Sequence, residues 1–281
     1  MHGTDECATS CGIAYLNLSR SCKSYLLNKK MNIMRKFLLS IIALIGLVMA
    51  PAASALTLNS ERLNYQIVYH WGVVWKHAGD ATLSISRSDN GYNAMLTGKT
   101  RSWADKIYPV RDTLKCMMHS NFHPIKYEKL THEKSYYARD IVAFSSNGGG
   151  TSAKCTRYRK DKPTVNINLS TSGVAYDMLS VFYMLRNLDY DRMASSKVYK
   201  TCIFSGKEKE TLTIKYLGVK PLQLRDKSRH QAFHLKLSFT RDNGKKSSDG
   251  IDAYISTDAR RIPLMVVGKL PIGEVKCYYA K

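Results

Sequence analysis

The chain has 281 residues, and its 43 Lys and Arg outnumber its 22 Asp and Glu, which gives a formal net charge of +21 at pH 7. Hydrophobic residues make up 44% of the chain, enough for a domain with a substantial core. The excess of positive charge favours anionic partners and argues against cationic ones.

The N-terminal region predicts export from the cytoplasm. Met34-Arg-Lys36 is basic, residues 37–49 are apolar, and Ala53-Ser-Ala55 is a small-x-small cleavage site. These are the three parts of a secretory signal peptide, which we place at residues 34–55. An uncleaved membrane anchor is the alternative, although the apolar run is short for a span.

Residues 1–33 are long and polar for the start of a signal peptide, so we interpret them as an upstream extension, with Met31 or Met34 as the true first residue. The mature chain, residues 56–281, then forms a single β-rich domain that is periplasmic or secreted and does not span the membrane. It keeps 37 basic and 20 acidic residues, a net charge of +17. In that compartment the expected partners are lipids or other anionic envelope components, such as lipopolysaccharide or acidic glycans, rather than nucleic acid.

Alternation of apolar and polar side chains predicts antiparallel strands along the mature chain. Asp89-Asn-Gly91 is typical of a hairpin turn, and Asp161-Lys-Pro163 interrupts the pattern before a polar loop of about ten residues. The expected strands are 63–69, 81–85, 92–102, 107–118, 124–134, 137–144, 152–159, 198–204, 210–217, 222–224, 232–240, 251–255, 262–267 and 275–279.

One helix is expected, over Tyr176–Arg186. Met178, Val181, Phe182 and Leu185 recur at helical spacing, and further apolar residues widen that face. So apolar a helix has to be surrounded, and a sheet of many strands closes or curls. The predicted fold class is therefore mainly β, with about a dozen antiparallel strands in a curled sheet or incomplete barrel around one central apolar helix.

Four cysteines remain in the mature chain: Cys116, Cys155, Cys202 and Cys277. Their even number in an exported chain permits two disulfides in three connectivities, while a core large enough to fold without them leaves buried free thiols and a single disulfide as equal alternatives. The residues that share their strand faces predict that Cys116 and Cys277 are buried. Cys155 shares its face with an arginine and is expected to be the most exposed.

The sequence contains no pattern typical of catalysis, and we expect neither a metal nor a cofactor. His119, His123, His132 and Glu133 were weighed as a metal site, but Phe122-His-Pro124 places a turn among them. No G-x-S-x-G, H-E-x-x-H, phosphate-binding loop or dinucleotide fingerprint occurs. We therefore expect a protein that is not an enzyme, while unlinked catalytic residues would leave no local pattern.

Arginines next to aromatic residues indicate a ligand site. A guanidinium binds an oxyanion while neighbouring rings cover an apolar body, so such a group suits an amphipathic anion. The competing interpretation is that Arg101 and Arg111 pair with Asp105 and Asp112 inside the structure. The candidate ligand-binding residues, with two taken from the expected helix, are Arg101, Trp103, Tyr108, Arg111, Phe182 and Tyr183.

Several motifs follow one another in an order that resembles a known family. They are Leu63-Asn-Tyr65, Ala78-Gly-Asp-Ala-Thr82, Thr100-Arg-Ser102, Val110-Arg-Asp112, Asp177-Met-Leu-Ser180, Leu185-Arg186, Phe204-Ser-Gly-Lys-Glu208, Arg261-Ile-Pro263 and Pro271-Ile-Gly273. With them the chain resembles the exported bacterial proteins of domain of unknown function 3108. The resemblance implies a β-rich envelope protein without an assigned activity, and it brings no catalytic residues. A weaker similarity, of fold only, is to the periplasmic lipoprotein carriers, whose incomplete barrels hold acyl chains.

Three functions remain open. The first is a periplasmic binding or carrier module for an amphipathic anionic ligand. The second is a structural or interaction protein of the envelope with a fully packed barrel, and the third is a hydrolase of envelope glycans or lipids. A cavity beside Phe182 and Tyr183 would favour the first over the second.

Overall fold

The computed structural model describes residues 56, 58–196, 198–245, 250–270 and 273–281. The expected extension and signal peptide lie outside the described residues. Contacts group Ala55–Lys281 into one compact unit. In the described part of the chain, no helix is long and apolar enough to cross a membrane.

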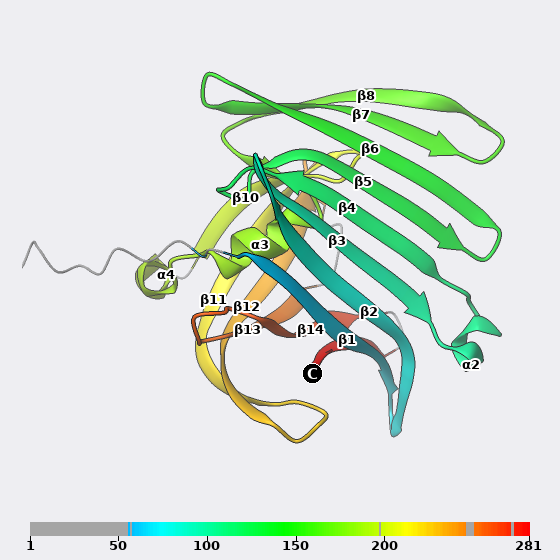
Figure 1. The fold of residues 1–281 in the computed structure, drawn as a ribbon, viewed down its shortest axis with the longest axis vertical. Coiled ribbons are helices and arrows are strands. Elements are labelled where there is room, and N and C mark those ends of the chain that lie inside the picture. The colour runs from blue at the N-terminus through cyan, green and yellow to red at the C-terminus, as the bar shows by residue number, and fades with distance from the viewer. Residues whose placement is uncertain (1–55, 57, 197, 246–249, 271–272) are drawn as a thin grey trace, which may run out of the picture. The chain divides into compact units, whose positions relative to one another are not determined.

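The first half of the unit is a meander of eight antiparallel strands, interrupted by the one-turn helix α2 (Ser102–Asp105) between the third and fourth (Figure 1). The strands are β1 (Ser60–Trp71), β2 (Val74–Ser88), β3 (Gly91–Thr100), β4 (Arg111–Met118), β5 (Pro124–Glu133), β6 (Tyr136–Asn147), β7 (Gly150–Arg159) and β8 (Lys162–Ser172).

The second half begins with the short strand β9 (Ala175–Tyr176) and the helices α3 (Ser180–Arg186) and α4 (Tyr190–Ser196). A second antiparallel meander follows. Its strands are β10 (Val198–Phe204), β11 (Lys209–Gln223), β12 (Arg229–Arg241), β13 (Ile251–Ser256), β14 (Pro263–Lys269) and β15 (Glu274–Ala280).

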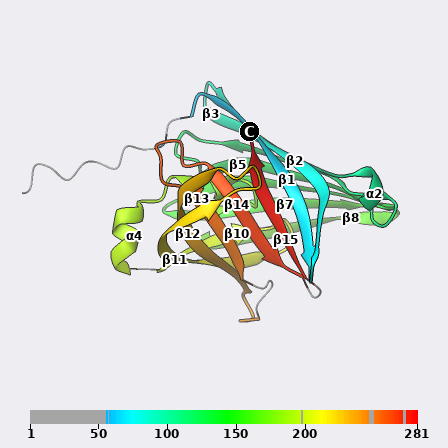
Figure 2. The ribbon, with the colours of Figure 1, turned by 90° about the horizontal axis from the view of Figure 1, so that it is seen from below.

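Pairing between β1 and β15 joins the two meanders into one sheet of fifteen strands, ordered β8 to β1 and then β15 to β9. Figure 2 shows β15 beside β1. The sheet curls so far that its two halves meet again near its ends. There, Phe144 of β6 stacks on Phe204 of β10, with ring centroids 5.9 Å apart. The result is the nearly closed, barrel-like sheet that the sequence predicts.

Helix α3 lies inside the curve of this sheet (Figure 1) and packs in two directions. Leu179, just before the helix, and Tyr183 belong to a core cluster that draws on both meanders, whereas Val181, Met184 and Leu185 belong to a cluster formed within the second half of the unit. The predicted central apolar helix is therefore present, although it is shorter than expected, because Tyr176 pairs as part of β9.

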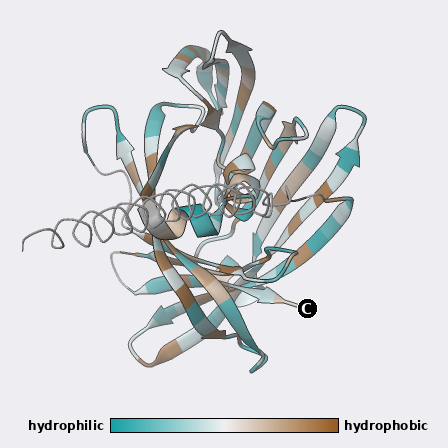
Figure 3. Cartoon of the chain, turned by 90° about the vertical axis from the view of Figure 1, so that its left-hand side faces the viewer, coloured by the Kyte–Doolittle hydropathy of each residue, from teal (hydrophilic) through white to brown (hydrophobic). Residues whose placement is uncertain are grey.

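Side chains alternate between the interior and the solvent along the strands, as the changing colours of Figure 3 illustrate. In β2, Leu83 and Ile85 are buried, whereas Ser84 is only half-buried and Ser86 is exposed. This period of two is what the sequence pattern predicts for a sheet with one wet face.

Two strand predictions were wrong. The expected polar loop after Asp161 is the strand β8, an edge of the sheet whose residues are all exposed or half-buried. Val165, Ile167 and Leu169 do alternate with polar residues, and Ile167 and Leu169 pack against the core, so the signal was present but was outweighed by Asp161-Lys-Pro163 and the polar residues around it. The second error was to divide β11, which continues past Leu217 through a register shift between Tyr216 and Val219.

The prediction for Cys155 was also wrong. Cys155 is completely buried, Cys116 is buried as predicted, and Cys277, predicted to be buried, is half-buried like Cys202; all four cysteines of the described residues are free. Arg157, which shares a face with Cys155, also points inward and pairs with the buried Asp140 at 3.1 Å. The presence of an arginine on the same strand face therefore did not mean that this face is exposed to solvent.

Candidate ligand-binding cavity

An apolar cavity of about 210 Å³ lies beside α3, between the strands that join the two meanders. It is bounded by β1, β2, β3, α3, β14 and β15. Its lining residues, all apolar except for one phenol and one thiol, are Tyr65, Ile67, Ala81, Leu83, Leu96, Phe182, Pro263, Val266 and Cys277.

Tyr65 contributes the apolar surface of its ring to this lining. Its hydroxyl is buried and has no hydrogen-bond partner among the described residues. Burial raises the pKa of Tyr65, so the phenol stays neutral and keeps its proton to donate. Its ring meets that of Tyr279 edge-on, with centroids 6.1 Å apart. A buried donor without an acceptor costs about 1–3 kcal/mol.

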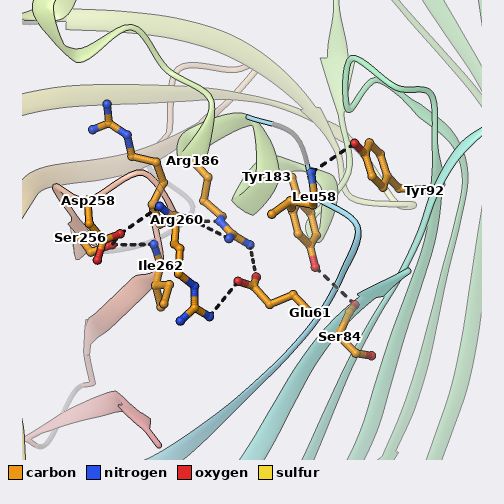
Figure 4. A network of polar contacts seen from close by, with 11 residues as sticks. Leu58, Glu61, Ser84, Tyr92, Tyr183, Arg186, Ser256, Asp258, Arg260 and Ile262 are labelled. Atoms are coloured by element: carbon orange, nitrogen blue, oxygen red, sulfur yellow. Dashed lines mark hydrogen bonds and ion pairs between the residues drawn. The ribbon is translucent and has the colours of Figure 1, made fainter. Parts of the chain in front are cut away.

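A buried ion pair anchors the end of α3 (Figure 4). Arg186, whose side chain is fully buried, places Nη1 2.7 Å from Oε2 of Glu61. Its Nε and Nη2 donate hydrogen bonds to the backbone carbonyl oxygens of Arg261 and Arg260, at 3.0 and 2.8 Å. The guanidinium thus ties α3 to β1 and to the loop between β13 and β14, and it is already neutralised.

The two helix residues predicted to bind ligand play different parts. Phe182 is half-buried and lines the cavity. Tyr183 is fully buried, and its hydroxyl donates to the carbonyl oxygen of Ser84 at 3.3 Å (Figure 4). Its ring stacks near Phe122, with centroids 6.0 Å apart. Tyr183 therefore fastens the helix to the sheet, and Phe182 faces the cavity.

The predicted arginines lie at the ends of β3 and β4 beside α2 and are absent from the cavity lining. Arg101 Nε is 3.0 Å from Oδ2 of Asp80, and Arg111 Nη2 is 2.8 Å from Oδ2 of Asp105. The competing interpretation thus named one right partner, Asp105, but the partner of Arg101 is Asp80 and both arginines are exposed rather than inside the structure. Asp112 instead accepts a hydrogen bond from the backbone N–H of His132.

The two predicted aromatic residues lie in the same α2 region. Trp103 donates its Nε1–H to the carbonyl oxygen of His77 at 2.7 Å, and the ammonium of Lys76 lies 4.1 Å from its ring centroid. Tyr108 donates to Oε2 of Glu133 at 2.8 Å. The six predicted residues therefore form two separate groups, one around α2 and one on α3.

Sequence reasoning missed most of the cavity lining. The alternation of Leu63, Tyr65 and Ile67 correctly indicates the inward face of β1. It does not reveal that β15 lies beside that strand and brings Cys277 opposite Ile67. The unpartnered hydroxyl of Tyr65 likewise has no signature in the sequence.

The buried carboxylate of Asp177 stabilises the start of α3. Its Oδ1 accepts hydrogen bonds from the backbone N–H groups of Leu179 and Ser180, at 2.7 and 2.8 Å, and its Oδ2 accepts one from the thiol of Cys116 at 3.0 Å. Burial raises the pKa of Asp177 despite these donors. Within the described residues, no group of three His, Cys, Asp or Glu is arranged to hold a metal ion.

Together, the curled sheet and the helix inside its curve define a β-barrel-like protein with an apolar cavity beside that helix. The family model of DUF3108, described as a protein of unknown function, matches residues 64–279, so the chain belongs to that family. The resemblance seen in the motifs is thereby confirmed.

A solved structure shows a similar fold. It is the crystal structure of a beta-barrel-like protein of domain of unknown function DUF1849 from Brucella abortus, with a TM-score of 0.54 and 10% sequence identity. The similarity covers 80% of this chain and 97% of that one. No curated protein matches the chain.

Proposed function

We propose that this protein is a non-enzymatic binding or carrier module of the cell envelope for an amphipathic ligand whose apolar part occupies the cavity beside Phe182. The observation that carries the proposal is the cavity itself, which lies where a fully packed barrel would have side chains. Export by the expected signal peptide would bring the protein to envelope lipids.

The size and lining of the cavity limit the ligand. A dry apolar cavity of about 150 Å³ holds a benzene-sized molecule, and drug-sized ligands need about 300–1,000 Å³. A volume of about 210 Å³ therefore suits one short acyl chain or one small ring system. The lining residues present only apolar surface to the cavity, so the part of the ligand that enters it is apolar.

The charge of the protein supports an anionic polar end for this ligand. The net charge of +17 for residues 56–281 attracts anions generally. Arg186 is paired with Glu61 and is therefore a poor counter-ion. The ionised end of the ligand accordingly stays outside the cavity, where surface Lys and Arg residues interact with it.

Filling the cavity tests the proposal. Ala81→Leu adds three carbons to a half-buried position in the lining, whereas Ala143→Leu makes the same change at an exposed position on β6. Native mass spectrometry of protein purified from its own envelope is expected to show a bound small molecule in the wild type and in Ala143→Leu. We expect Ala81→Leu to lose about 90% of it, because the added side chain occupies the ligand's space.

The same measurement tests the structural alternative. A wild-type mass without any ligand, together with no stabilisation of the wild type by octanoate in urea unfolding, would leave the structural or interaction protein as the better account. Equal ligand retention by Ala81→Leu and Ala143→Leu would show that the ligand binds elsewhere.

A further inference from the structure

The hairpin between β1 and β2 ends in an apolar tip, which we define by Trp71, Val73, Val74 and Trp75. These side chains are 57%, 96%, 43% and 52% exposed. Gly72, with φ +54°, starts the two-residue turn, and Val73 follows it where turns usually carry polar residues. Concentrated exposed apolar residues of this kind mark interaction sites.

The tip is apolar on both faces of the ribbon. Trp71 is paired with Val74 across the hairpin and Trp75 with His70, so consecutive pairs point to opposite faces. A flat protein surface would cover one of these faces only. A medium that surrounds the whole tip would cover both, as the outer layer of a lipid bilayer does.

Cationic groups lie just behind the tip. The ring of Trp75 stacks on His70 with centroids 3.6 Å apart, and the ammonium of Lys276 is 4.6 Å from its centroid. Lys76 and Lys269 are exposed. Glu274, the carboxylate opposite His70 and Lys269 in the sheet, is hydrogen-bonded to Nδ1 of His70 and ion-paired with Lys276, at 2.9 Å each.

Neighbouring elements extend this surface. Gly273, just before β15, lies close to His70: a Cβ added to Gly273 would come within 2.3 Å of the carbonyl oxygen of His70. The turn between β14 and β15 therefore lies beside the tip. Leu270, in that turn, is 43% exposed. Figure 2 shows the end of the hairpin next to the start of β15.

We propose that the β1–β2 tip is a docking site for an anionic lipid surface, in which Trp71, Val73, Val74 and Trp75 insert among the headgroups. Tryptophan prefers the membrane interface, since its ring is apolar and its N–H is polar. Lysines behind the inserted residues interact with anionic headgroups. This surface is distinct from the cavity beside Phe182, and the inference does not depend on ligand binding there.

Vesicle binding tests this inference with one exposed residue. Val73→Asp changes a side chain that is 96% exposed, so folding is unaffected, and it places a negative charge at the tip. Val165→Asp makes the same change at a 48% exposed position on β8. All proteins are produced from the full-length chain and compared in the same form, so residues outside the sheet contribute equally.

We expect the wild type and Val165→Asp to sediment with vesicles of phosphatidylethanolamine and phosphatidylglycerol, and more weakly with phosphatidylcholine alone. Val73→Asp should lose about tenfold in affinity, because it removes apolar burial and repels the anionic surface. Brominated acyl chains should quench tryptophan fluorescence in the wild type and not in Val73→Asp, which keeps all three tryptophans.

Three results would overturn the proposal. The first is equal vesicle binding by Val73→Asp and Val165→Asp. The second is the absence of binding by the wild type. The third is a wild-type dimer that Val73→Asp dissociates, which would assign the tip to a second copy of the chain. Ala81→Leu should bind vesicles like the wild type, so failure of the cavity proposal and failure of the docking proposal are distinguishable.

Discussion

Glu61 and Arg186 show how a single pair fixes the position of the central helix. Arg186 brings a full charge to a position where its side chain is inaccessible to solvent, and Glu61 is 11% exposed. Burying two charges costs several kcal/mol, which their attraction and the two carbonyl acceptors of Arg186 offset. The sequence shows both residues but not their pairing, because 125 positions of chain separate them.

Removing the carboxylate should therefore be costly. Glu61→Leu leaves the guanidinium of Arg186 buried without a counter-ion, and we expect a loss of about 3–5 kcal/mol in the free energy of unfolding measured with urea. Arg260→Met removes the other partner of Glu61. Because the side chain of Arg260 is 60% exposed, this change should cost less than about 1 kcal/mol. Equal losses in the two variants would contradict this assignment.

At the scale of the element, α3 depends on a carboxylate that precedes it. Asp177 accepts hydrogen bonds from two backbone N–H groups in the first turn, and α3 has only seven residues. Such N-terminal acceptors stabilise helices by about 1 kcal/mol. The apolar periodicity predicts this helix, whereas β8 escaped prediction although Val165, Ile167 and Leu169 alternate along it, because the turn residues before it and the polar residues around these three favoured a loop.

The raised pKa of Asp177 has a testable consequence for stability. A carboxyl group whose pKa is higher in the folded protein favours folding when it is protonated, and this contribution is lost as pH rises through the folded pKa. Asp177→Asn keeps an oxygen acceptor without a charge, so we expect the variant to gain stability relative to the wild type between about pH 4 and about pH 7.

Urea unfolding across this pH range measures the difference between the two proteins. Asp105 provides a control of opposite sign, because its hydrogen bonds from Arg111 and Thr100 lower its pKa to about 2. Asp105→Asn should therefore lose stability relative to the wild type as pH rises from about 2 to about 4, below the range used for Asp177, and the difference should stay constant above about pH 4. A pH-independent difference for Asp177→Asn would show that Asp177 has the same pKa in the folded and unfolded chains.

At the scale of the molecule, the pairing of the first strand with the last makes one sheet out of two meanders. The sequence predicts a curled sheet around a helix, since many alternating strands need closure and an apolar helix needs cover. It does not predict that Tyr65 lies opposite Tyr279, because strand pairing between distant segments leaves no local pattern. The cavity lies beside this junction, and for that reason Phe182 was its only lining residue among those predicted.

The strand order predicts where the sheet opens first. β1 and β15 lie in the middle of fifteen strands and are paired on both sides, whereas β8 is an edge with exposed or half-buried residues. Amides in the middle should exchange hydrogen only through global unfolding, and those of β8 through local opening at a lower free energy. Hydrogen exchange followed by mass spectrometry should thus show β8 exchanging much faster than β1 and β15. Protection of β8 equal to that of β1 would mean that another element covers this edge in solution.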